Sequence, residues 1–195
     1  KENNYLGNGL TVNAKLDLSE ESIKGKFSLK NPNYKNSDKS IYTNIQSSET
    51  NRLSDFGYKT NKTGFTFGTD FEYYDDLFLG VGINSYYENI ETDSTASSQQ
   101  QKLKGNYFDN FVSLSFDYDK RNQKFQTTQG YRNYFSTDLP LISETNTVAN
   151  TFITTNYFEY FNDNVLKTSF YFRNSNSISG DNVKLSARQY LPQKR

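Results

Sequence analysis

A two-residue alternation of apolar and polar side chains constrains this chain more than any other feature. Residues 10–18 read LTVNAKLDL, with apolar residues on one parity and polar residues on the other. A β-strand points successive side chains to opposite faces, so this period predicts a strand with one apolar and one polar face. The pattern recurs along the chain between polar segments, which predicts an all-β, antiparallel, up-and-down sheet.

Nine segments carry the alternation clearly, and a tenth is a candidate. We expect strands at about residues 10–18, 23–29, 40–48, 63–74, 77–84, 112–118, 131–139, 147–161 and 165–173, with a possible tenth at 183–190. Residues 75–76 and 162–164 read as tight turns, whereas residues 49–62 and 88–107 read as long polar loops. Short turns on one rim and long loops on the other are typical of outer-membrane barrels. We therefore predict an incomplete transmembrane β-barrel, with about nine or ten strands of a larger barrel.

The two faces of these strands have different chemistry. The polar parity carries charged residues such as Lys15, Lys24, Asp70 and Asp117, whose burial in a small sandwich core would be costly. A wet lumen can hold them, whereas in a soluble sandwich the apolar face would meet a second sheet. Rings near strand ends suit the interfacial girdles of a barrel, although Tyr and Phe also favour strands in general. These rings are Tyr73, Tyr74, Phe78, Tyr86, Tyr87, Phe158, Tyr160 and Phe161.

Composition removes several classes of function. The 195 residues include no Cys, Met, Trp or His, so disulfides, thiolate or imidazole metal sites and His-based triads are excluded within this chain. We expect no enzyme activity, no cofactor and no metal. Lys and Arg number 22 and Asp and Glu number 22, so the chain lacks the basic excess of a nucleic-acid binder, and no nucleic-acid partner is expected. A chain without Met is expected to be part of a longer product, and an open sheet in lipid would also need further strands to close it.

One segment resembles a known family. Residues 118–130, YDKRNQKFQTTQG, are similar to the Tyr-Asp-x-Arg-Asp and Pro-Thr-x-Gly signature of the BamA family of outer-membrane assembly factors, in the POTRA-barrel superfamily. The matching positions are Asp119, Arg121, Thr128 and Gly130, while Asn122 and Thr127 replace the usual Asp and Pro. Residues 4–9 resemble the turn that follows the first strand of the family's barrel, and residues 29–34 resemble a strand that ends in Asn-Pro and an aromatic residue.

The resemblance implies a domain organisation. Residues 183–195 look like the run that leads into the family's inward-folded loop, so Arg188, Pro192 and Arg195 would approach that loop. Residues 1–195 would form a partial outer-membrane barrel domain, spanning about the second to the eleventh of roughly sixteen strands. The POTRA domains, the first strand and the C-terminal strands would lie outside it.

The resemblance also implies a function. The chain would belong to a non-enzymatic factor that folds and inserts outer-membrane proteins in the bacterial outer membrane, without a cofactor. Its partners would be outer-membrane lipids, unfolded outer-membrane protein clients and accessory assembly lipoproteins. The alternatives are a passive pore or transporter and a related two-partner secretion or translocation barrel. For Asp119 and Arg121, the two interpretations are a pair that orders the rim of the barrel and an ordinary surface ion pair.

Overall fold

Ten strands form a single antiparallel sheet, in which each strand pairs with the next one in chain order. The computed structural model describes residues 2–5, 7–144, 146–161, 164–180, 183–184 and 187. The strands are β1 (Glu2–Tyr5), β2 (Leu10–Leu18), β3 (Ser22–Asn31), β4 (Lys39–Arg52), β5 (Tyr58–Tyr74), β6 (Leu77–Thr92), β7 (Gly105–Asp119), β8 (Gly130–Ser143), β9 (Thr147–Glu159) and β10 (Val165–Ser177). Two short helices, α1 (Leu53–Phe56) and α2 (Ser98–Gln101), lie between β4 and β5 and between β6 and β7.

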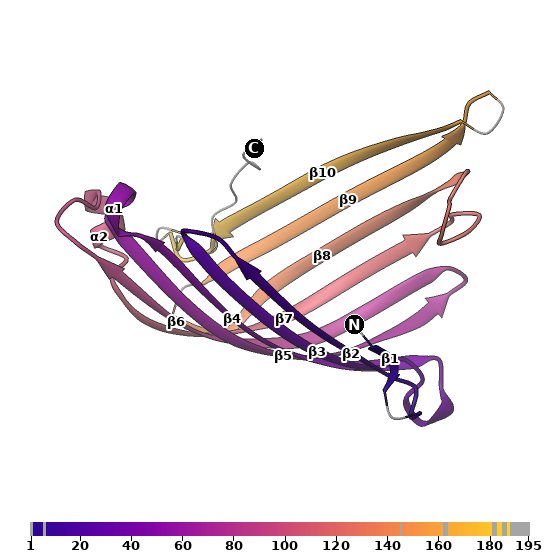
Figure 1. Ribbon diagram of the computed structural model, residues 1–195, viewed down its shortest axis with the longest axis horizontal. Coiled ribbons are helices and arrows are strands. Elements are labelled where there is room, and N and C mark those ends of the chain that lie inside the picture. Colours follow the sequence, from indigo (N-terminus) through magenta and orange to yellow (C-terminus); the bar gives the residue numbers. More distant parts are fainter. Residues whose placement is uncertain are drawn as a thin grey trace.

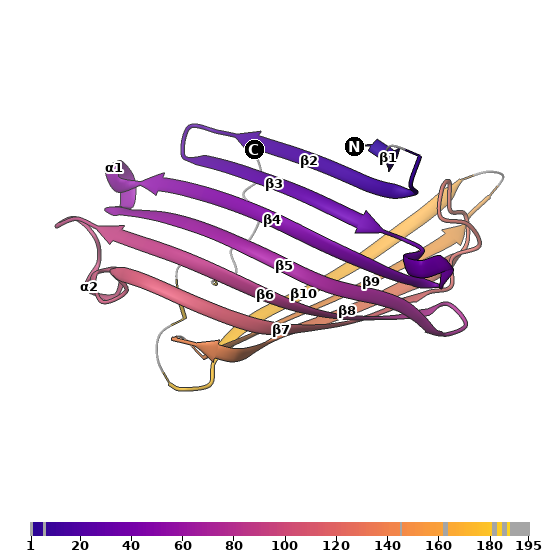
Figure 2. The same ribbon diagram turned by 90° about the horizontal axis from the view of Figure 1, so that it is seen from below.

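The sheet is curved but not closed. Figures 1 and 2 show it bending along the strand order into a trough, with β8, β9 and β10 rising away from β2 to β7. Within the described residues, β1 pairs only with β2 and β10 pairs only with β9. The architecture therefore confirms the prediction of an all-β, up-and-down, incomplete barrel.

The convex face of the trough is apolar. Phe67 on β5 pairs in register with Ile83 on β6, and Ile83 pairs with Val112 on β7. Phe67 and Ile83 are both exposed, as are most large apolar side chains of this parity. A soluble protein rarely exposes so much contiguous apolar surface, whereas the hydrocarbon of a bilayer is a suitable environment for it.

The concave face carries the polar parity. Thr11 on β2 and Tyr134 on β8 line the same hollow, although five strands lie between β2 and β8 in the sheet. The side chains of this parity must therefore face the inside of the curve. Two tyrosines on this face fill the space above glycines of neighbouring strands. The Tyr42 ring lies over Gly68, and a Cβ at Gly68 would come within 2.5 Å of the ring carbon Cζ and 2.9 Å of the Val81 carbonyl oxygen. Tyr86 fills the corresponding space above Gly64.

The two helices lie at one rim of the sheet (Figure 1), and a small apolar core is buried there. Tyr58, Ile90 and Leu103 are buried together there, and Tyr107 packs against them. The hydroxyl of Ser97 accepts a hydrogen bond from the Gln100 backbone N–H, while the Gln100 side chain accepts one from the Ser97 N–H, so α2 begins with a capping box. In the described part of the chain, neither helix has the length or apolar composition needed to cross a bilayer.

The structure confirms all nine clearly predicted strands but corrects the predicted connections. β4 continues to Arg52 and β5 begins at Tyr58, so most of residues 49–62 is strand. β6 continues to Thr92 and β7 begins at Gly105, so the predicted loop at 88–107 reduces to residues 93–104. Backbone pairing continues here without the alternation seen in the spans that face lipid. Both faces are polar at the end of β4, and the apolar side chains of Tyr58 and Ile90 lie on the otherwise polar, concave parity. Thr50 still pairs with Thr60, and Asn89 with Asn106.

The rims and the tenth strand also differ from expectation. The tight turn at 75–76 shares its rim with the longer connection at 120–129, while the other rim has the tight turn at 19–21. Short and long connections therefore occur on both rims. The tenth strand is β1 at Glu2–Tyr5, a segment too short to show a period. Val183 and Lys184 are not in a strand, and most of the candidate strand at 183–190 lies outside the described residues, as do Asn162 and Asp163 of the predicted turn.

Two of the predicted girdle rings point inward. Phe78 lies directly opposite Asp117, and Tyr86 lies directly opposite Asp109, both on the polar parity. The side chains of Tyr73, Tyr74 and Tyr87 are exposed. Tyr86 and Tyr87 are consecutive in a regular part of β6, so their rings face opposite sides of the sheet.

Candidate functional site

The connection between β7 and β8 brings the four predicted signature residues together. Asp119 ends β7 and Gly130 begins β8, so residues 120–129 return the chain to its neighbour. Arg121 grips Asp119 with two parallel hydrogen bonds, from Nε to Oδ1 at 2.7 Å and from the terminal nitrogen to Oδ2 at 2.6 Å. The two side chains are only 15% and 12% exposed. Such a shielded, two-pronged pair differs from an ordinary solvated ion pair.

The ion pair with Asp119 shifts the pKa of Arg121. Its hydrogen bond to the Asp119 carboxylate raises the pKa of the guanidinium, with burial acting in the opposite direction. The Tyr157 side chain on β9 raises the pKa of Arg121 further. Arg121 therefore stays charged at any physiological pH.

Asn122 organises the interior of the connection. Its Oδ1 accepts from the backbone N–H of Thr128 at 3.2 Å and of Gln129 at 3.3 Å, and its Nδ2 donates to the Thr128 hydroxyl at 2.7 Å. Its own backbone N–H donates to the Gln129 carbonyl at 3.1 Å. The side-chain oxygen at this position acts as an acceptor for two backbone donors, which explains why Asn can stand where the family pattern has Asp.

The backbone at Gly130 passes very close to the backbone at the start of the same connection, at Lys120 and Arg121. Its φ is +102°, and a Cβ there would clash with the Lys120 carbonyl oxygen and lie 2.9 Å from the Arg121 Cα. The backbone crossing is held by a hydrogen bond from the Lys120 N–H to the Tyr131 carbonyl at 2.8 Å. Only a residue without a side chain fits this crossing without displacing backbone.

An ion pair and a hydrogen bond join the β7–β8 connection to the neighbouring turn and strand end. Lys120 Nζ contacts Asp76 of the 75–76 turn at 2.7 Å, and Gln129 Nε2 donates to Glu159 at the end of β9 at 2.8 Å. The β7–β8 connection therefore joins three consecutive turns or strand ends into one rim.

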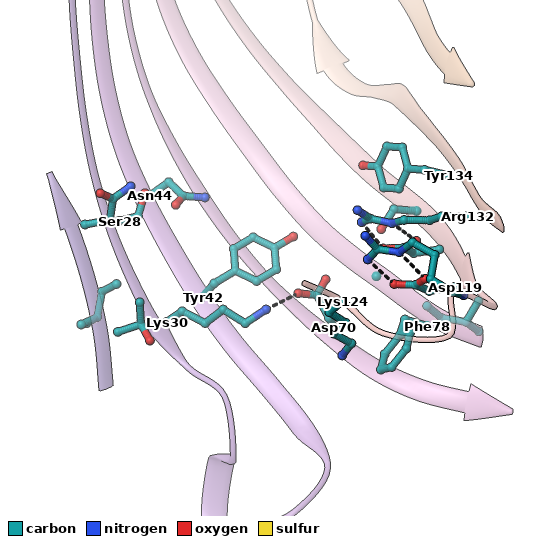
Figure 3. A pocket seen from close by; sticks show the side chains of 18 residues that line it. Ser28, Lys30, Tyr42, Asn44, Asp70, Phe78, Asp119, Lys124, Arg132 and Tyr134 are labelled. Atoms are coloured by element: carbon teal, nitrogen blue, oxygen red, sulfur yellow. Dashed lines mark hydrogen bonds and ion pairs between the residues drawn. The ribbon is translucent and has the colours of Figure 1, made fainter. Parts of the chain in front are cut away.

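A charged hollow of about 660 Å³ lies on the concave face beside this connection (Figure 3). Its carboxylates are paired with cations from other positions. Lys30 contacts Asp70 at 3.0 Å, and Arg132 holds Asp117 through two hydrogen bonds of 2.7 and 2.5 Å. The sequence predicted Asp70 and Asp117 on a wet face, but alternation gave no reason to select Arg132, Lys124 or Tyr42, which line the same space.

Among the residues that the structure describes, no three acidic side chains gather in a way that could hold a metal ion. Arg188, Pro192 and Arg195, predicted to approach an inward-folded loop, lie outside the described residues.

Asn122→Asp is expected to be tolerated, with a change of less than about 0.5 kcal/mol in the free energy of unfolding, because a carboxylate keeps both backbone bonds and the Thr128 hydroxyl can donate to it. Asn122→Ala removes all three side-chain bonds and is expected to cost about 1–2 kcal/mol. Urea titration of the full-length protein in detergent measures both. Equal stability of the Ala and Asp variants would show that the side chain does not organise the connection.

These features together define a class. The sheet is a curved antiparallel meander with an exposed apolar convex face and a charged concave face, and ion pairs and hydrogen bonds join the connections at one rim. This combination is that of the wall of an outer-membrane β-barrel. Comparison with known families identifies which one. The Omp85 superfamily domain matches residues 4–191, so the chain belongs to this superfamily, and it is located in the bacterial outer membrane.

The solved structures agree on the fold. The crystal structure of BamA from Haemophilus ducreyi lacking POTRA domains 1–3 is similar, with a TM-score of 0.74 and 16% sequence identity. The match covers 93% of this chain and 38% of that chain, so this chain spans well under half of the BamA structure. No curated protein matches the sequence. The resemblance read from residues 118–130 is thereby confirmed at the level of the superfamily and the barrel.

Proposed function

We propose that this chain is part of the barrel of an assembly factor that folds and inserts other outer-membrane proteins. The match of the Omp85 superfamily domain over residues 4–191 carries the proposal, and the likeness to a BamA barrel supports it. The clients are unfolded outer-membrane proteins, and accessory lipoproteins assist. POTRA domains precede the barrel, and further strands complete it.

The proposed mechanism is strand addition. An open strand edge presents unpaired N–H and C=O groups, which are costly in lipid and which an incoming strand can satisfy. The client then gains backbone hydrogen bonds and buries its apolar face in hydrocarbon, so the reaction needs no cofactor. In this proposal the seam lies between the first and last strands of the complete barrel, while the strands described above form the rigid wall that keeps it in place.

Reconstitution of the full-length protein in liposomes tests this function. A urea-denatured outer-membrane client is diluted into the liposomes, and its folding is followed by the resistance of its compact band to SDS. We expect folding to accelerate by about tenfold or more over liposomes that hold an unrelated closed barrel, because a seam lowers the cost of inserting unpaired strands.

Two other results would replace the proposal. Unchanged client folding with steady ion conductance would indicate a passive pore or transporter, for which the charged concave face is suited. Unchanged client folding with protease-protected uptake of a soluble passenger would indicate a secretion barrel of the same superfamily.

A further inference from the structure

The charged hollow on the concave face is lined by more cations than carboxylates. Its cations are Lys30, Arg121, Lys124 and Arg132, and its carboxylates are Asp70, Asp117 and Asp119. Each of the three carboxylates is paired with one of the cations described above. Among the described residues, Lys124 forms no ion pair. With four cations against three carboxylates the hollow has a net charge of +1, and this charge lies on Lys124.

A closed turn in the β7–β8 connection positions Lys124. The Thr127 hydroxyl donates to the Gln123 carbonyl at 2.6 Å, and the Gln123 side-chain amide donates to the Gln126 carbonyl at 2.5 Å. Lys124 Nζ lies 5.8 Å from the centre of the Phe78 ring, which also lines the hollow. An aromatic ring attracts an ammonium group but does not neutralise it. The charge of Lys124 is therefore held beside the hollow and is available to an anion.

The opposite wall of the hollow is neutral. Asn13 on β2, Ser28 on β3 and Asn44 on β4 are successive partners in the register, so they form a row across three strands. All three line the hollow, and within the described chain none of their side chains makes a hydrogen bond. In the view of Figure 3, Ser28 and Asn44 lie on one side, Arg132 lies on the other, and the Tyr42 ring lies between them. Amide and hydroxyl groups both donate and accept, so this row suits the hydroxyl groups of a ligand.

The arrangement of charges disfavours other classes of small ligand. A cationic ligand would have to displace a cation such as Lys30 or Arg132, because no carboxylate of the hollow is without one. A purely apolar ligand would leave the neutral row and Lys124 without hydrogen-bonding partners. A bare inorganic anion could contact Lys124 but would leave the row on the opposite wall without a partner. The hollow is therefore matched to a ligand that has both an anionic group and hydroxyl groups.

We propose that the hollow binds a small hydroxylated oxyanion of the class of sugar phosphates and sugar acids. Its anionic group lies against Lys124, whose ammonium group donates charge-assisted hydrogen bonds to phosphate or carboxylate oxygens. Its hydroxyl groups lie against the row of Asn13, Ser28 and Asn44. The volume of about 660 Å³ is within the usual range of small-molecule sites. This binding site goes beyond the proposed assembly function and does not depend on it.

Isothermal titration calorimetry of the full-length protein in detergent tests the site, with glucose 6-phosphate as the probe. We expect saturable binding, about tenfold or more tighter than that of glucose or of inorganic phosphate, because each of these offers only part of the contacts. Lys124→Gln should weaken the binding of glucose 6-phosphate about tenfold or more. Lys35→Gln is the matched control, since Lys35 Nζ also lies over a ring, 5.4 Å from the centre of Tyr34, but lies outside the hollow. This variant makes the same change in charge and should bind like the parent.

A second variant tests the neutral row separately. Ser28→Ala combined with Asn44→Ala should weaken the binding of glucose 6-phosphate but leave that of inorganic phosphate unchanged, and the compact band on SDS gels shows that each variant is folded. The proposal is overturned if the parent shows no saturable binding, if glucose 6-phosphate and inorganic phosphate bind equally, or if Lys124→Gln and Lys35→Gln have equal effects. Because the readout is binding rather than client folding, its failure and the failure of the proposed assembly function are distinguishable.

Discussion

Gly130→Ala is expected to destabilise the barrel by about 3 kcal/mol or more. Two causes add. The backbone at Gly130 has a φ of +102°, which L residues rarely adopt, and the new Cβ would clash with the Lys120 carbonyl oxygen. Since backbone atoms block the methyl group, β7 and β8 must separate at the rim. Thermal conversion of the compact band on SDS gels, with the full-length protein, measures the loss.

Gly9→Ala is the matched control for this variant. Gly9 also has a positive φ, +69°, but a Cβ there meets no atom within 4 Å. Only the backbone strain remains, so we expect a cost of about 1 kcal/mol. Equal losses at the two positions would mean that the close approach of Gly130 to Lys120 has no energetic role.

Arg121→Ala is expected to cost about 3 kcal/mol, because it leaves the shielded Asp119 carboxylate without its cation. Arg121→Lys should recover only part of this, since an ammonium group cannot make two parallel bonds to one carboxylate. The double variant Arg121→Ala with Asp119→Asn should be more stable than Arg121→Ala alone. Urea titration of the parent, Arg121→Ala, Asp119→Asn and the double variant gives the coupling energy directly.

The Lys15–Asp17 pair provides the control for this cycle. It has the same spacing of two residues and a contact of 2.7 Å, but its side chains are 64% and 54% exposed. Lys15→Ala should therefore change stability by less than about 1 kcal/mol. If Arg121→Ala is as mild as Lys15→Ala, the ion pair at the rim is an ordinary surface pair.

Strands could be predicted wherever one face meets lipid. In β2 and β10 the alternation is strict, because hydrocarbon selects apolar residues on one parity and the lumen accepts polar ones on the other. The ends of β4 to β7 gave no such signal, since both faces are polar around Ser48 and the apolar Ile90 lies on the otherwise polar parity beside Asn89. Their pairing is set by the neighbouring strand rather than by their own composition. β1, at Glu2–Tyr5, gave no signal because four residues are too few to show a period.

The site was predictable only where it is local in sequence. Asp119, Arg121, Thr128 and Gly130 belong to one connection, so a motif could bring them together. Tyr42 above Gly68, and Lys184 between Glu88 and Asp109, depend on contacts between residues far apart in the chain. The sequence does not distinguish a buried lysine in a polar segment from a solvated one. Only the register and curvature of the sheet show that Lys184 is buried.

The pairing of every strand with its immediate neighbour in the chain has a further consequence for how such barrels diversify. A hairpin that is duplicated or deleted as a unit leaves the pairing of all other strands intact, because no strand has a distant partner to lose. Barrel circumference can thus change by two strands in one genetic event. Contacts across the trough, such as that of Lys184, are what such an event would disturb, and they would limit which hairpins can be exchanged.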